Sequence, residues 1–236
     1  MKEEILFGEQ YEELSKTYKN FDNFQTKSVQ RAIRDYTAVK ESILDVGCAD
    51  GYLTELFTRS NYVAGIDCND YLRYECLRIG FDEHVIQDLN KPWTCFDADR
   101  KFDTIFCGQT IEHIADTDLL LCEFNRHLRL GGHLIITTPN VRTIQSLCRM
   151  ALNKTPAFGA RYRSGHLRDF TTSSLRKAVE NNGFSVVETK GVEFWSPIFQ
   201  ESLSAMFSYL PSLSTAFMMV CRKQLTVEYK GTQFEY

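Results

Sequence analysis

The segment QTIEHI, residues 109–114, places a carboxylate and an imidazole side by side directly after an apolar run. An imidazole with a pKa near ~6.5 can remove a proton from a hydroxyl group at neutral pH. A carboxylate and an imidazole are also suitable ligands for a divalent cation. In a third interpretation, Glu112 caps the next helix or accepts a backbone hydrogen bond, and His113 is buried beside it. The segments around the pair decide where it lies.

These segments predict an α/β fold. Short, mostly apolar runs alternate with segments of helical period, which indicates right-handed crossovers and a mostly parallel sheet. We expect strands at 42–47, 62–67, 83–88, 102–108, 133–139, 184–189 and 214–223. We expect helices at 52–60, 70–80, 116–132 and 171–183, and two more within residues 1–40.

The composition is that of a globular chain, long enough for one good-sized core or for a core domain with a small appendage. The 236 residues are 43% hydrophobic and 25% charged, and a net charge of −4 argues against a general binder of nucleic acid or anionic membranes. The first ten residues show no secretory signal, and Pro211 interrupts the uncharged window 202–221, which argues against a membrane span. None of the eight cysteines forms a Cys-x-x-Cys pair, so we expect reduced cysteines in a cytoplasmic protein and no zinc knuckle.

The turn after the first strand, in ILDVGCADG (43–51), consists of small residues. Gly47, Ala49 and Gly51 leave room for a ligand to approach the backbone. The alternative is a tight turn between a strand and a helix that binds nothing.

Acids at three successive strand ends favour a ligand. Asp45 lies in the first strand, and Asp67 ends the second, where an acid can bind the two hydroxyls of a ribose. Asp88 ends the third strand, where it can meet the amino group of adenine. A pyrophosphate would need a glycine where Tyr52 stands and would be repelled by Asp50, which opposes a nicotinamide dinucleotide. The cationic ammonium and sulfonium of S-adenosylmethionine suit acids such as Asp45.

The chain resembles a known family over roughly residues 40–223. In order, the motifs are ILDVGCADG, GID, QDLN, FDTIFCGQTIEHI, LRLGGHLIITTPN and HLRDFTTSSLRKAVENNGFSVVE. The chain is similar to class I S-adenosylmethionine-dependent methyltransferases, especially ubiquinone-biosynthesis and small-molecule O-methyltransferases and those that accompany glycan assembly. The resemblance implies a single Rossmann-like domain with a seven-stranded, mostly parallel sheet of order 3-2-1-4-5-7-6 and an antiparallel strand seven. It assigns cofactor binding to Asp45, Gly47, Cys48, Ala49, Gly51, Asp67, Cys68, Asp88, Leu89 and Gln109. The family has a glycine more often where this chain has Ala49.

The resemblance also implies a division of the chain into N-terminal helices, a methyltransferase core and a C-terminal tail. We expect N-terminal helices in 1–40 to pack over the cofactor site, ahead of a methyltransferase core in 41–223. Within the core we expect a basic lid at 142–170 and an apolar insertion at 192–212, followed by a tail at 224–236.

The segment expected to face the methyl acceptor is basic. Residues 142–177 hold eight Lys or Arg and one acid, Asp169, so this segment carries a net charge of +7. We expect it to cover an anionic acceptor such as a phosphate, nucleotide-sugar or carboxylate, with His166 and Arg168 as contacts. A solvated surface is the alternative. The apolar segment 194–210 is open to three interpretations: an acceptor pocket, the face of a homodimer, or core packing.

The expected reaction is methyl transfer from S-adenosylmethionine to a hydroxyl of a small-molecule or glycan intermediate, with S-adenosylhomocysteine as the product. His113 is the candidate base, with Glu112 beside it. Relatives carry Glu-x-x-Glu-His here and bind a divalent cation, whereas this chain has Gln109 first, so a cation set of Gln109, Glu112, His113 and His166 stays open. The alternatives are an RNA 2′-O-methyltransferase, supported only by the basic lid, a nicotinamide-dependent oxidoreductase, and a non-catalytic cofactor-binding protein.

Overall fold

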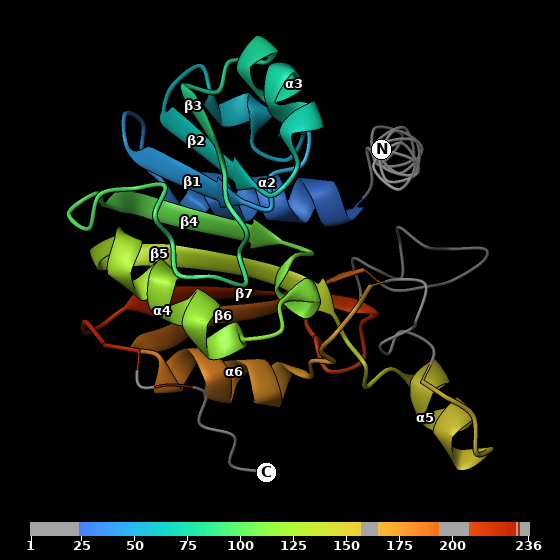
Figure 1. Cartoon of the computed structure of the whole chain (residues 1–236). Helices are drawn as coiled ribbons and strands as arrows, with labels where there is room; N and C mark the ends of the chain where they lie inside the picture. Colours follow the sequence, from blue (N-terminus) through green and yellow to red (C-terminus); the bar gives the residue numbers. More distant parts are fainter. Residues whose placement is uncertain (1–23, 157–164, 194–207, 230, 232–236) are drawn as a thin grey trace, which may run out of the picture.

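The computed structural model describes residues 24–156, 165–193, 208–229 and 231, which build one seven-stranded sheet (Figure 1). Its order, β3-β2-β1-β4-β5-β7-β6, confirms the predicted fold class. Strand β7 runs antiparallel to both of its neighbours, and the other pairs are parallel. The strands are β1 (Ser42–Val46), β2 (Tyr62–Asp67), β3 (Glu83–Ile86), β4 (Phe102–Gly108), β5 (Leu128–Pro139), β6 (Phe184–Glu193) and β7 (Ala216–Lys223).

Helices cover both faces of this sheet. Helices α4 and α6 lie on one face and α2 on the other, while α5 projects from the end of the sheet where β5 finishes (Figure 1). The helices are α2 (Phe24–Tyr36), α3 (Arg73–Arg78), α4 (Thr117–His127), α5 (Ile144–Ala151) and α6 (Thr172–Asn181), and the 3-10 turns are η1 (Glu55–Phe57), η2 (Asp70–Leu72) and η3 (Ile111–His113). The first expected helix and most of the apolar insertion lie outside the described residues.

Alternation along the strands builds two cores, one on each face of the sheet. In β1, Leu44 belongs to the core that includes Leu120 of α4, whereas Ile43 belongs to the core that includes Ile33 of α2. Successive side chains of a strand point to opposite faces, so an unbroken apolar run is buried on both sides. Each fully buried Leu or Ile contributes roughly 1.5–3 kcal/mol, and the sheet edge that carries the loops is thereby held in place.

The prediction of a helix at 52–60 is wrong. Only the three-residue turn η1 forms there. The hydroxyl of Thr54 donates to Asp45, and that of Thr58 donates to the Glu55 carbonyl. Side-chain hydrogen bonds of this kind compete with helix formation.

The boundaries around β5 also differ from the prediction. Helix α4 ends at His127 rather than at the double glycine, and β5 begins at once, at Leu128. Leu128 pairs with Phe102, and after an irregular stretch the pairing resumes between Thr104 and His133. Pairing with β4 therefore overrides the helical pattern of residues 128–132.

None of the described helices combines the length and the apolar character that crossing a membrane requires. All eight cysteines lie in described segments as free thiols, and five of them are buried.

Candidate active site

The loop after β1 meets the loop after β4 at the carboxyl edge of the sheet. Gly47, Ala49 and Gly51 have positive φ angles of 69°, 48° and 75°. A Cβ built on Gly47 would lie 2.2 Å from Oγ1 of Thr110, whose hydroxyl lies 3.3 Å from the Val46 carbonyl. The absence of a side chain at Gly47 thus lets the two loops touch.

Asp67 holds the β1 loop from the end of β2. Its Oδ2 accepts the Ala49 N–H at 3.0 Å, and its Oδ1 accepts the Asn69 N–H at 2.9 Å. A carboxylate offers about four acceptor positions, so roughly two remain for hydroxyl groups. These acceptor positions fit the hydroxyls of a ribose, although the side chain is largely buried. Cys68 follows it and is exposed.

Asp88 lies just past β3 and is exposed. Its Oδ1 accepts the Asn90 N–H at 3.0 Å, and its Oδ2 lies 3.2 Å from Nζ of Lys91. The Asn90 N–H is the main cause that lowers the pKa of Asp88, which therefore stays ionised at neutral pH. Leu89 is buried beside it. The exposed carboxylate fits the expected amine of an adenine.

Asp45 differs from the other two acids. It is buried, and its Oδ2 accepts the Thr54 hydroxyl at 2.6 Å. Burial raises the pKa of Asp45 to about 8. Its clearest role in this structure is to hold Thr54 against β1, and its contact with a cofactor stays a prediction.

Gln109 begins the β4 loop in a left-handed conformation, with a φ of 51°. Its N–H donates to the Thr137 carbonyl at 2.9 Å, and its side-chain amide donates to the Thr137 hydroxyl at 3.3 Å. The side chain is thus held by β5, at the edge that the cofactor is expected to occupy.

Glu112 lies in η3 and is only 2% exposed. Its Oε2 accepts the Thr138 hydroxyl at 3.1 Å, and burial raises its pKa to about 7. Its carbonyl accepts the N–H groups of Leu167 and Arg168, at 2.8 and 3.0 Å. The residue joins the β4 loop to both β5 and the segment before α6, and it does not cap α4, whose N-cap is Asp116.

His113 contacts the segment before α6, at Gly165 and His166. Its Nδ1 lies 3.1 Å from the Gly165 carbonyl, and its ring meets that of His166 edge to face, with 4.8 Å between centroids. Burial, and then the neighbouring His113, lower the pKa of His166. A carboxylate oxygen of Glu112 and one ring nitrogen from each histidine lie within 4.8 Å of one another.

The structure therefore brings together Glu112, His113 and His166, three of the four residues in the cation set that the sequence leaves open. Arg168 is held in a different way, because its guanidinium donates to the Ala115 carbonyl. Thr138, which touches Glu112, was not singled out from the sequence. No local signal marks it, because the contact crosses 26 residues and depends on the pairing of β4 with β5.

A sheet of this order is that of the class I methyltransferases. The family described as "Methyltransferase domain" matches residues 18–189, and the chain belongs to it. S-adenosylmethionine is the cofactor of this class, as the exposed Asp88 and the remaining acceptor positions of Asp67 allow.

Curated relatives agree with the family. A ubiquinone biosynthesis O-methyltransferase of Paracidovorax citrulli is 22% identical over 77% of this chain and 76% of its own length. One of the same description from Mesorhizobium japonicum is 32% identical over 50% of this chain and 47% of its own length. The chain spans about half the length of the first curated relatives it matches.

Solved structures show the same fold. The N-methyltransferase NodS of Bradyrhizobium japonicum, solved with S-adenosylhomocysteine, is 16% identical, with a TM-score of 0.60 over 87% of this chain and 91% of that one. The cyclase SpnF is also 16% identical and has a TM-score of 0.60, over 84% of this chain and 80% of that one. The fold alone therefore does not specify the reaction.

Proposed function

We propose that this chain transfers the methyl group of S-adenosylmethionine to a hydroxyl of a small-molecule or glycan intermediate of anionic character. The observation that carries the proposal is the convergence of Glu112, His113 and His166 beside the meeting point of the β1 and β4 loops. S-adenosylmethionine, when bound, supplies a methyl group activated by a positively charged sulfur. The protein has then to position the acceptor and take up its proton.

The hydrogen bond of His113 suits it to the second task. The Gly165 carbonyl can only accept, so the contact at 3.1 Å requires the proton of a neutral His113 ring to lie on Nδ1. The lone pair is then on Nε2, where it can accept a proton from a hydroxyl. A lowered pKa keeps His166 uncharged near neutral pH, so it adds no positive charge beside that lone pair.

Two observations support the acceptor class. The curated relatives named above are O-methyltransferases of ubiquinone biosynthesis, which favours oxygen over nitrogen as the target. Residues 142–177 carry seven more positive than negative charges. Positive charge next to the acceptor side favours a phosphate or carboxylate on the acceptor.

A second candidate mechanism rests on the same three side chains. One carboxylate and two imidazoles within 4.8 Å of one another form a donor set for a divalent cation, which would orient the acceptor oxygen and lower its pKa. The amide of Gln109 is bonded to Thr137, and it is a weaker ligand than a carboxylate. An RNA 2′-O-methyltransferase would also follow this cation mechanism.

The experiment has a binding arm and a transfer arm. S-adenosylhomocysteine at a hundred times its dissociation constant should stabilise the chain by ~2.7 kcal/mol, a shift in Tm of roughly 5–10 °C, whereas NAD should give none. S-adenosylmethionine with a labelled methyl group is then offered with phenols, sugars and nucleotide-sugars, each with and without an anionic group, and with RNA. We expect transfer to an anionic hydroxyl compound. Transfer only to amines, or only to RNA, would contradict the proposal, and loss of transfer in EDTA with recovery in Mg²⁺ would select the cation mechanism.

A further inference from the structure

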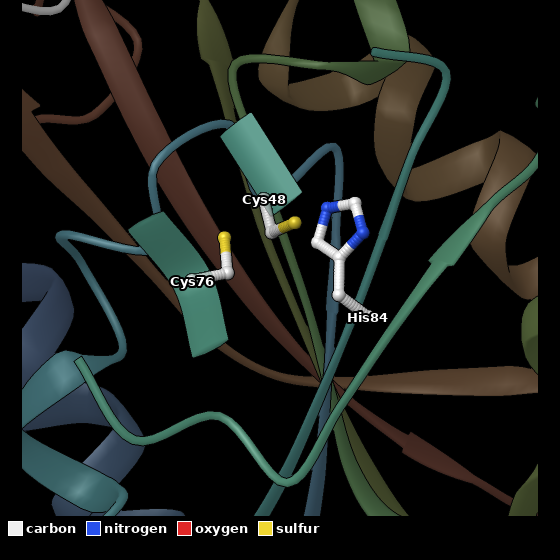
Figure 2. Close-up of side chains that lie close together, drawn as sticks. All are labelled: Cys48, Cys76 and His84. Carbon is white, nitrogen blue, oxygen red and sulfur yellow. The ribbon is translucent and has the colours of Figure 1, made fainter. Parts of the chain in front are cut away.

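Cys48, Cys76 and His84 come from three different elements and converge beside the β1 loop (Figure 2). Cys48 lies in the loop after β1, Cys76 in α3 and His84 in β3. One sulfur or nitrogen atom from each lies within 4.8 Å of the other two. The three residues are 6%, 0% and 4% exposed, and Figure 2 shows their side chains side by side, with Cys48 drawn between the other two.

His84 is the feature that calls for an explanation. Neither of its ring nitrogens has a hydrogen-bond partner among the described residues, although the side chain is buried. A buried polar group without a partner costs about 1–3 kcal/mol and is rare in native structures. The two nearby sulfurs are weak hydrogen-bond partners but strong metal ligands when ionised.

The two sulfurs lie beside each other and beside an imidazole. The Cys48 thiol is the main cause that lowers the pKa of Cys76, and the adjacent His84 acts in the same direction. A metal ion would displace the proton of each thiol, because the thiolate is the form that binds metals.

Space for Cys48 depends on a glycine. A Cβ built on Gly65 of β2 would lie 2.8 Å from Sγ of Cys48. The thiol of Cys76 donates to the Ala49 carbonyl at 3.2 Å, in the loop expected to hold the cofactor. An ion bound here would therefore link that loop to α3 and β3.

We propose that Cys48, Cys76 and His84 form a binding site for a thiophilic d10 cation, Zn²⁺ or Cu⁺. Two thiolates and an imidazole are soft ligands that select these ions over Mg²⁺ or Ca²⁺. Zn²⁺ would complete a tetrahedral shell with one further ligand, whereas Cu⁺ is satisfied by the three side chains. The spacings of 28 and 8 residues match no zinc motif, so the sequence alone does not reveal this site.

The cation site has a consequence for the cofactor loop. Ala49 and Gly51 hold positive φ angles, and the loop lies between Asp67 and Cys76. A bound ion that restrains the loop should raise the Tm of the chain and tighten the binding of S-adenosylhomocysteine. This effect is independent of which acceptor is methylated.

The test uses the full chain, stripped of metal and kept reduced under nitrogen. Zn²⁺ is titrated in competition with a chromophoric chelator, and Cu⁺ with a chelator specific for that ion. The variants are Cys76→Ser and His84→Gln, and Cys148→Ser, at an exposed thiol of α5, is the matched control. Two ligand variants are used so that one that fails to fold does not decide the result.

We expect one ion per chain in the wild type and in Cys148→Ser. Loss of groups that only support metal ligands costs ~10–100-fold in affinity, so removing a ligand should cost at least as much. Co²⁺ should give a thiolate-to-metal charge-transfer band that disappears in both ligand variants. Absence of stoichiometric binding of either ion, or equal binding by His84→Gln, would overturn the proposal; equal binding would place the ion elsewhere, for example at Glu112, His113 and His166.

Discussion

The hydroxyl of Thr138 in β5 donates to the buried carboxylate of Glu112 across 3.1 Å. The contact ties the candidate active-site loop to the sheet, and it opposes the rise in the pKa of Glu112 that burial causes. One threonine therefore influences both the position and the charge of a group beside His113.

Thr138→Val removes this hydrogen bond and keeps the shape of the side chain. We expect a loss of ~1–3 kcal/mol in the free energy of unfolding, because a buried carboxylate loses its donor. The pKa of Glu112 is about 7, so the loss should be larger at pH 8, where the carboxylate is ionised, than at pH 6. Urea unfolding of both proteins at the two pH values measures this loss in the free energy of unfolding.

Thr189→Val is the matched control for this substitution. The hydroxyl of Thr189 has no partner among the described residues, so its removal breaks no hydrogen bond. Removing this buried hydroxyl should not lower the free energy of unfolding, and any change should be equal at both pH values. A loss as large as that of Thr138→Val would show that the hydrogen bond to Glu112 is not the cause.

The pKa of Asp45 predicts how stability changes with pH. Its ordinary value is 3.8, and burial raises it to about 8. Because the folded-state pKa is raised, the contribution of Asp45 to stability is full below pH ~4 and is lost as pH rises toward 8. A tenfold change in proton affinity corresponds to about 1.4 kcal/mol, so the loss of stability across this range is of the order of several kcal/mol.

Asp45→Asn isolates this contribution. The amide oxygen can still accept the Thr54 hydroxyl but does not ionise. Between pH 5 and 8, the free energy of unfolding should fall less steeply in the variant than in the wild type. Parallel curves for the two proteins would show that Asp45 does not titrate in this range.

Much of this architecture is visible in the sequence. The runs at 62–67 and 102–108 match β2 and β4 residue for residue, because buried parallel strands are nearly continuous apolar runs. Glu112, His113 and His166 could also be singled out, the first two by adjacency. Most of the failures depend on contacts that the local pattern of residues does not reveal. Pairing of Leu128 with Phe102 ends α4 early, and the hydrogen bond from the Thr54 hydroxyl to Asp45 competes with helix formation at 52–60. Likewise, Cys48, Cys76 and His84 meet only after β1, α3 and β3 are assembled.

Asp67→Ala tests the ribose assignment. The substitution removes the carboxylate that accepts the Ala49 and Asn69 N–H groups, and it should abolish measurable binding of S-adenosylhomocysteine in calorimetry. Asp82→Ala is the matched control, because its carboxylate also accepts a backbone N–H, from Val63, ahead of β3. Both variants should lose stability, but only the first should lose the ligand. Normal binding by Asp67→Ala would rule out the assignment.

Gly47→Ala tests the close approach of the β1 and β4 loops. The added Cβ would lie 2.2 Å from Oγ1 of Thr110 and would occupy a backbone with a positive φ. We expect a lower Tm and weaker binding of S-adenosylhomocysteine. Gly131→Ala is the control, since its φ is also positive but its nearest neighbour is the flexible Arg222 at 3.4 Å. A ligand affinity unchanged in both variants would show that the contact with Thr110 does not shape the cofactor site.

His113→Asn distinguishes proton transfer from mere packing. The asparagine amide can still donate to the Gly165 carbonyl but has no lone pair of imidazole basicity. With the best acceptor found in the transfer assay, we expect kcat to fall by ~10²–10⁴-fold while the affinity for S-adenosylhomocysteine stays unchanged. Raising the pH should partly restore the rate in the variant, because more of the hydroxyl acceptor is then ionised in solution. If His113 instead holds a divalent cation, excess Mg²⁺ should restore the rate of the variant, and raising the pH should restore less of that rate. Full activity in metal-free buffer would exclude both roles and leave His113 as a packing partner of His166.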